Sequence, residues 1–202
     1  MVRFDDFAFG FSWWIEEPMT RTSHALDTGD GVWLVDPVDV PEAIDRATAL
    51  GTPAGVIQLL DRHNRDCAAL AARLGVPHLR LPSAVPGTPF TVIRVLDLPR
   101  WRERALWWPE RGVLVVAEIV GTNGVYALGR GPAGLHPLVR ALPPGALRHL
   151  QPEHLLVGHG PGVHGPRAAA ALEDAYDRAR TDLPKLVLKL PGMVRAAVRG
   201  GR

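Results

Sequence analysis

The sequence predicts an α/β (α+β) protein built on mixed β-sheets. Short β-prone runs occur along the whole chain of 202 residues, and helical segments alternate with them from residue 41 onward. Proline or glycine stands at the ends of the helical segments, as is typical of helix boundaries. Hydrophobic residues make up 47% of the chain and the formal net charge is +2. This composition indicates a globular protein whose core has room for two or four layers.

The first half of the chain predicts strands around one hairpin, followed by alternating helices and strands. Thr28-Gly29-Asp30-Gly31 has the residues of a tight hairpin turn. The first helix begins with Pro41, and a parallel crossover through it is right-handed by rule. The expected elements are a β-prone segment at 7–15, strands at 23–27 and 32–36, a helix at 41–50, a strand at 55–60 and a helix from 64 or 66 to 74.

The second half repeats this alternation. Residues 109–112 predict a tight turn, and the glycine- and proline-rich residues 121–144 predict a loop over one face. The expected elements are strands at 89–96, 105–108 and 113–117, a helical turn at 146–150, a strand at 154–157 and a helix at 166–180. We expect one domain over residues 1–182, followed by a basic tail over residues 183–202.

The sequence also restricts location and partners. It has no run of roughly 18 apolar residues and no signal-peptide core at its N-terminus, so we expect a cytoplasmic protein without a membrane span. A single cysteine, Cys67, excludes an internal disulfide and suits a reducing compartment. Basic residues form no stripe with interleaved aromatics, so we expect no nucleic-acid partner. Tryptophans and the apolar residues of the tail leave a homodimer open, and prolines favour surface packing of the tail over contact with an anionic membrane.

The most informative motif is Gly158-His159-Gly160, which follows the apolar run 155–157. An imidazole at the end of a buried strand is well placed to bind a metal or to move a proton. The flanking glycines have no side chains that block access to it. The alternative is that His159 simply hydrogen-bonds loop backbone in a glycine-rich turn.

Four motifs in the same order resemble those of the metallo-β-lactamase superfamily, over about residues 20–175. They are the opening hairpin with Val35-Asp36-Pro37, the strand-to-helix segment 59–67, the apolar strand 112–118 and the closing Gly158-His159. The resemblance implies a four-layer αββα sandwich of two mixed β-sheets with outer helices. It also implies a site at one edge of the sheets.

The metal motif of that family, H-x-H-x-D-H, is degenerate in this chain. Alignment on Asp66 places Arg62 and Asn64 at the first two histidine positions and Cys67 at the last. The resemblance then implies one remaining metal site, for zinc or iron, made of Asp66, Cys67, Glu118 and His159. A shifted register of the alignment lets His63 join this metal site. The expected catalytic residues are His63, Asp66 and His159. A buried, inert Cys67 thiol is the alternative.

The arginines of this segment suggest anion binding. Arg62 and Arg65 lie near a predicted helix N-terminus, where an anion is favoured. The other residues expected to line this site are His136, Arg140 and His164. Glu118 ends a buried strand and needs a partner, for which an arginine of residues 62–65 is the natural choice. Two functions follow: a hydrolase of an ester, thioester or phosphoester with one metal ion, or a metal-free protein that binds an anionic small molecule or a protein partner.

Overall fold

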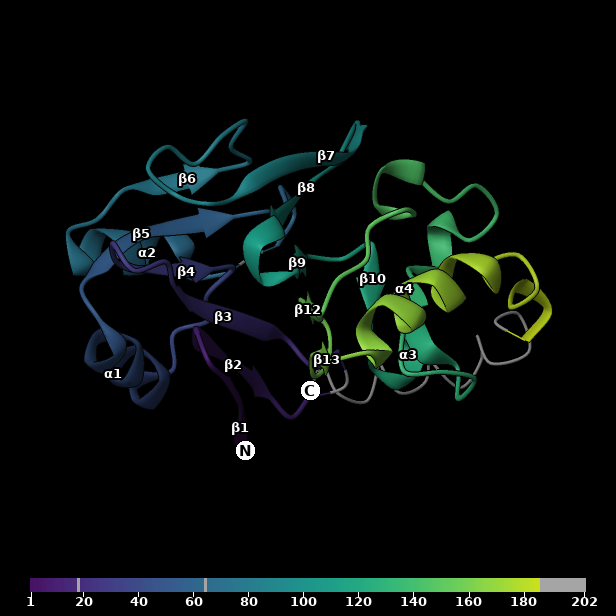
Figure 1. The fold of residues 1–202 in the computed structure, drawn as a ribbon, viewed down its shortest axis with the longest axis horizontal. Coiled ribbons are helices and arrows are strands. Elements are labelled where there is room, and N and C mark those ends of the chain that lie inside the picture. Colours follow the sequence, from purple (N-terminus) through teal and green to yellow (C-terminus); the bar gives the residue numbers. More distant parts are fainter. Residues whose placement is uncertain (18, 64, 186–202) are drawn as a thin grey trace.

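The computed structural model describes residues 1–17, 19–63 and 65–185, and it consists of two large mixed β-sheets with helices on their outer faces (Figure 1). The first sheet has the order β1-β2-β3-β4-β5-β6. Its first four strands are antiparallel, whereas β4, β5 and β6 are parallel. The strands are β1 Val2–Phe7, β2 Gly10–Ile15, β3 Thr22–Asp27, β4 Val32–Val35, β5 Pro53–Gln58 and β6 His78–Arg80.

The second sheet has the order β13-β12-β9-β8-β7. Its central pair, β9 and β12, is parallel, and the flanking pairs are antiparallel. The strands are β7 Thr91–Leu98, β8 Trp101–Trp108, β9 Val113–Val116, β12 His154–Val157 and β13 Val163–His164. A small separate ladder joins β10 Val120–Gly121 to β11 Gly134–Leu135.

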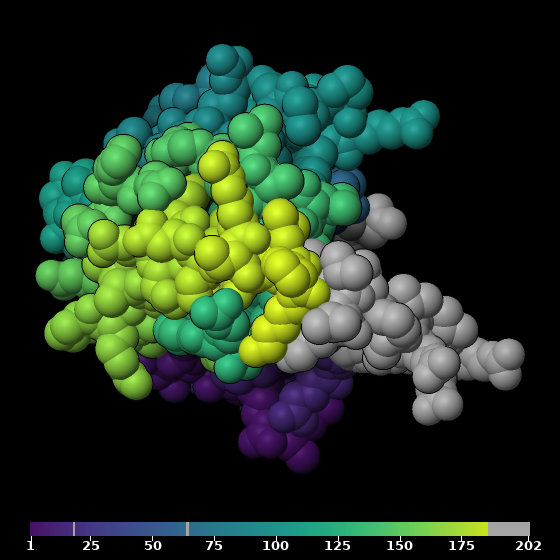
Figure 2. Space-filling model, turned by 90° about the vertical axis from the view of Figure 1, so that its right-hand side faces the viewer, coloured from purple at the N-terminus to yellow at the C-terminus, as the bar shows by residue number. Residues whose placement is uncertain are grey.

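Helices cover the outer face of each sheet. α1 Pro41–Leu50 and α2 Cys67–Leu74 pack on the first sheet, and α4 Arg167–Asp177 packs on the second. α4 lies at the surface above the N-terminal strands (Figure 2). The remaining helical pieces are α3 Gly124–Ala127 and the 3₁₀ turns Pro109–Arg111, Pro137–Val139 and Gly145–Leu147.

Two hydrophobic clusters correspond to these layers. The larger fills the space between the sheets and continues under α4, and Leu114 of β9 and Leu172 of α4 are both fully buried in it. The smaller lies between the first sheet and the helices α1 and α2. Apolar residues on both faces of the central strands explain why those strands are continuous hydrophobic runs. The predicted αββα sandwich of mixed sheets is therefore confirmed.

Three segments differ from the sequence predictions. The β-prone segment 7–15 is half of an N-terminal hairpin, whose other strand, β1, has too many charged residues to be recognised as a strand. Segment 121–144 contains β10, α3 and β11 in addition to loops. β8 begins at Trp101, four residues earlier than expected, because the alternating residues Arg102, Glu103 and Arg104 continue the strand.

Most of the predicted basic tail, residues 186–202, lies outside the described residues. Among the residues that the structure describes, no helix combines the length and apolar character needed to cross a membrane.

Candidate metal centre

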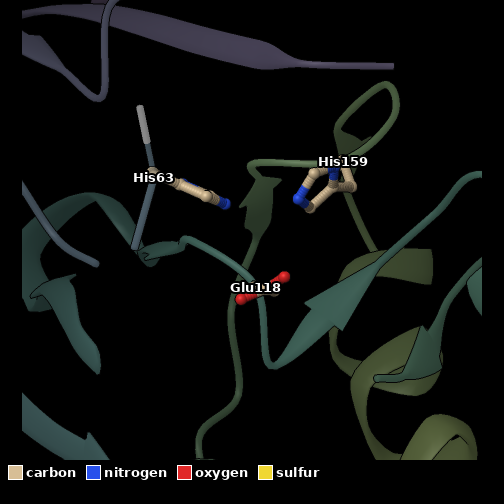
Figure 3. Close-up of side chains that lie close together, drawn as sticks. All are labelled: His63, Glu118 and His159. Carbon is tan, nitrogen blue, oxygen red and sulfur yellow. The ribbon is translucent and has the colours of Figure 1, made fainter. Parts of the chain in front are cut away.

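Three side chains meet at the edge where strands from both sheets end. Glu118 follows β9 and His159 follows β12, and because these strands are parallel they present both residues at one edge. His63 lies in the loop after β5 of the other sheet. Figure 3 shows the two imidazole rings and the carboxylate directed toward a common space. One ligand atom from each residue lies within 4.8 Å of the others, and the described part of the chain holds no second group of this kind.

His159 presents a free nitrogen to this space. Its Nδ1 lies 2.8 Å from the carbonyl oxygen of Met19, which can only accept a hydrogen bond. The proton therefore resides on Nδ1, and Nε2 carries a lone pair. That Nε2 is buried and has no hydrogen-bond partner among the described residues. Burial lowers the pKa of His159 to about 4, so the ring is neutral near pH 7.

His63 is a buried histidine whose ring nitrogens are left without hydrogen bonds to the described residues. Its side chain is 10% exposed, and neither ring nitrogen has a hydrogen-bond partner among the described residues. The nearest acidic atom is Oδ2 of Asp36, 4.0 Å from Nδ1. Burial, followed by the charge of Arg65, lowers the pKa of His63 well below its usual range. A neutral imidazole in such a place lacks the bonds that buried polar groups normally make.

Glu118 is held by groups on both of its oxygens. Arg62 donates from Nε to Oε2 at 2.9 Å, and its Nη2 lies 2.8 Å from the same oxygen, which is the partnership expected from the sequence. His136 Nε2 lies 3.7 Å from Oε1. Since Nδ1 of His136 accepts the backbone N–H of Leu138, its proton is on Nε2 and faces the carboxylate. Burial raises the pKa of Glu118, and Arg62 opposes that shift.

Arg65 places a second guanidinium beside the two histidines. Its Nη2 donates to the carbonyl of Gly158 at 3.1 Å, whereas Nη1 is buried and has no partner among the described residues. Its charge lowers the pKa values of His63 and His159 and also that of Asp36, although burial still raises the Asp36 pKa to about 6. The site thus combines two neutral imidazoles with fixed positive charge.

Asp66 and Cys67, which the sequence placed in the expected ligand set, do not lie with this cluster. The carboxylate of Asp66 accepts the backbone N–H of Asp39 at 2.7 Å, at the start of α2. Cys67 faces the apolar cluster under α2, where burial raises the pKa of its thiol and keeps it protonated. Consecutive residues at a helix start diverge, and here both turn to structural partners. His63, which the shifted register allowed, lies with Glu118 and His159 instead.

Arg140 and His164 are also placed away from the common space. Arg140 is fully buried and donates to Asp182 and to the carbonyls of Leu135 and Tyr126, so its guanidinium is already occupied. His164 pairs with β12 at His154, the end of that strand opposite His159, and bonds to Asp5. Of the five residues expected to bind an anion, the structure brings Arg62, Arg65 and His136 to the centre.

Three further residues of the site were not predicted. Tyr126 stacks on His159, with ring centroids 5.7 Å apart and an angle of 17° between the rings. Trp101 packs its ring under the guanidinium of Arg62. Glu103 is buried behind Glu118. Nothing in the local sequence marks any of these three residues as part of a site.

Comparison with known proteins gives a likeness of fold. No protein-family model matches the chain, and no curated protein matches it by sequence. Among solved structures, an NDM_FIM-1-like metallo-β-lactamase from Erythrobacter litoralis in the mono-zinc form is 12% identical with a TM-score of 0.58, over 88% of this chain and 97% of that chain.

Two further solved metallo-β-lactamase structures show the same likeness of fold. FIM-1 from Pseudomonas aeruginosa, also in the mono-zinc form, is 14% identical with a TM-score of 0.52, over 88% of this chain and 96% of that chain. A metallo-β-lactamase from Pontibacter korlensis is 11% identical with a TM-score of 0.53, over 88% and 99%. The chain is therefore a protein of the metallo-β-lactamase fold, as the resemblance in the sequence implied.

Proposed function

We propose that this protein is a hydrolase that uses one metal ion, zinc or iron, to cleave an anionic ester, thioester or phosphoester. The observation that carries the proposal is the convergence of His63, Glu118 and His159, whose ligand atoms lie within 4.8 Å of each other. Two histidines and one carboxylate form a donor set that zinc and iron both accept in mononuclear sites.

The environment of the three residues fits a metal ion. His159 has the tautomer that a ligand requires, because the Met19 carbonyl fixes the proton on Nδ1 and leaves Nε2 free. The buried nitrogens of His63 have no hydrogen-bond partner among the described residues, which is costly in a site that holds nothing. A metal ion held by these three residues would supply Lewis-acid chemistry, lowering the pKa of a bound water molecule and polarising the substrate.

Arg62 is suited to stabilise an anionic substrate. Its side chain is 35% exposed, whereas that of Glu118 is 12% exposed, so the guanidinium lies at the solvent side of the centre. Trp101 holds it in place, with the guanidinium carbon 4.0 Å from the ring centroid. The proton of His136 faces the other oxygen of the same carboxylate, so two donors flank Glu118 on this side of the centre.

The test is metal binding by the untagged protein. We expect near-stoichiometric zinc or iron by elemental analysis, and loss of the metal in His159→Ala and His63→Ala. His164→Ala is the matched control because His164 lies at the other end of β12 and is bonded to Asp5. Chelation is then expected to lower the melting temperature of the wild type and to abolish hydrolysis of model esters and phosphoesters. Absence of metal after loading with zinc, iron and manganese contradicts the proposal.

A second function, anion binding without metal, is favoured by Arg65. Its Nη1 is buried and unpaired among the described residues, beside two neutral histidines that do not neutralise its charge. A carboxylate or phosphate oxygen satisfies this donor directly. Calorimetry of the metal-free protein with inorganic phosphate separates the two: heat of binding that is lost in Arg65→Gln favours the second function, and its absence favours the first.

A further inference from the structure

Glu103 is a fully buried carboxylate directly behind Glu118. It lies on β8, just beyond the point where β8 stops pairing with β9. Its Oε1 accepts the backbone N–H groups of Glu118 and Ile119, at 2.8 and 2.9 Å. The Glu103 side chain thus takes the place of the strand carbonyls that would accept these N–H groups if the sheet continued. Glu103 therefore fixes the backbone of Glu118, just after the end of β9.

The second oxygen of Glu103 bonds to Trp101, whose ring contacts both partners of the Glu118 carboxylate. Oε2 accepts the indole N–H of Trp101 at 3.2 Å. The Trp101 ring carries the guanidinium of Arg62 on its face, 4.0 Å from the centroid, and contacts the His136 ring edge-on at 4.8 Å. These are the two residues that flank the oxygens of Glu118. One buried carboxylate therefore supports both the backbone of this ligand and the groups that orient its side chain.

The same part of β8 also supports the loop that carries His63. The backbone N–H of Arg104 donates to the carbonyl of Leu59 at 2.8 Å, and Asp61 donates to the carbonyl of Arg102 at 3.1 Å. Glu103 forms a β-bridge with Leu60 between these two bonds. The strand that contains Glu103 therefore connects the two sheets where two of the three ligands originate.

We propose that Glu103 is the positioning residue of the metal centre. It does not ligate the ion; it aims Glu118 at His63 and His159 by holding the Glu118 backbone directly and Arg62 through Trp101. This inference rests on the proposed function, since the arrangement that Glu103 maintains is that of the three proposed ligands. Partners of this kind that surround metal ligands typically contribute 10–100-fold to metal affinity.

The test compares zinc affinity in graded variants. Glu103→Ala removes all three hydrogen bonds and is expected to lower zinc affinity by roughly 10–100-fold. Glu103→Gln keeps an oxygen for the two backbone N–H groups but presents an N–H to the indole N–H of Trp101. The loss of affinity in Glu103→Gln is therefore expected to be smaller than in Glu103→Ala. Trp101→Phe removes the same hydrogen bond and also changes the ring under Arg62, so it is expected to lower zinc affinity as well.

Two controls separate positioning from general stability. Asp182→Asn alters another buried carboxylate, which pairs with Arg140 and Arg178. Trp13→Phe removes another buried indole, which donates to the carbonyl of Val38 in the smaller core cluster. Both are expected to lower the melting temperature without changing zinc affinity. Where Glu103→Ala fails to fold, the glutamine and Trp101 variants carry the comparison.

The outcomes distinguish this inference from the proposed function. Zinc affinity in Glu103→Gln and Trp101→Phe equal to the wild type, or equally reduced in both controls, overturns the role of Glu103. A wild type that binds neither zinc nor iron nor manganese overturns the proposed function instead. Glu103 is then judged by amide hydrogen exchange at Glu118 and Ile119, which is expected to be faster in Glu103→Gln because an amide oxygen is a weaker acceptor than a carboxylate. Equal exchange rates overturn the inference in that case as well.

Discussion

At the scale of single residues, burial keeps the imidazole of His24 neutral, and this has a consequence for stability. The side chain is 2% exposed, Nδ1 lies 2.8 Å from the hydroxyl oxygen of Ser12, and burial lowers the pKa of His24 to about 3. Because the unfolded chain binds a proton near pH 6.5, the contribution of neutral His24 is complete above that pH and is lost as the pH falls toward 3.

The prediction for His24 is a weaker dependence of stability on acid when it is replaced. Near pH 5, protonation of the unfolded state is expected to cost the wild type about 2 kcal/mol relative to pH 7.5. In His24→Asn this part of the loss disappears, since asparagine does not titrate. Urea denaturation of both proteins at the two pH values measures the difference. Equal losses in the two proteins contradict the prediction.

Single residues also show what the sequence could reveal about the site. His159 was identifiable because glycines on both sides of a histidine at a strand end are an unusual local pattern. Asp66 and Cys67 were chosen from the family alignment, and the structure places both with other partners, the backbone of Asp39 and the smaller apolar cluster. Glu103 acts through contacts with residues far along the chain, such as Ile119, and no local pattern encodes those contacts.

At the scale of elements, the ends of β9 and β12 approach so closely that one position between them requires glycine. A Cβ built on Gly158 lies 2.1 Å from the carbonyl oxygen of Ala117. We expect Gly158→Ala to lower the free energy of unfolding by about 1–3 kcal/mol, because the two strand ends must separate. Thermal unfolding measures this, with Gly145→Ala as the control, since nothing lies within 4 Å of a Cβ there. A melting temperature of Gly158→Ala equal to that of the control contradicts the prediction.

Elements with clear boundaries were the ones predicted well. α1 has the predicted bounds because Pro41 and Gly51 enclose it, and β12 coincides with its apolar run. β1 and β6 were not predicted, because a charged edge strand and a three-residue strand show no periodicity of their own. Pairing with neighbouring strands, rather than composition, makes these segments strands.

At the scale of the whole molecule, the inter-sheet core carries the stability of the fold. Leu114 of β9 is fully buried between the sheets, whereas Leu138 is 74% exposed. Leu114→Ala is expected to lower the free energy of unfolding by roughly 2–5 kcal/mol, and Leu138→Ala to leave it unchanged. Urea denaturation tests the pair, and a small effect of Leu114→Ala contradicts a core shared by both sheets.

The global arrangement was predictable from the order of motifs rather than from propensities. Alternating strands and helices predict mixed sheets, but the pairing of β9 with β12 joins segments separated by a long loop. The resemblance of the four motifs supplied that arrangement. No motif in the sequence predicted that β8 of the second sheet also contacts the loop after β5 of the first. The structure shows this contact in the bridge between Leu60 and Glu103.

The distance along the chain between His63, Glu118 and His159 has a consequence for biosynthesis. A growing chain contains no short segment with all three side chains, so an ion has nothing to capture until residue 159 has left the ribosome. Unlike a zinc finger, whose ligands gather the ion while the chain is unfolded, this protein is expected to reach its tertiary structure first and to acquire metal afterwards. For the proposed metal centre, the choice of ion is then expected to depend on the finished cavity and on cellular supply, rather than on the order in which the three residues emerge.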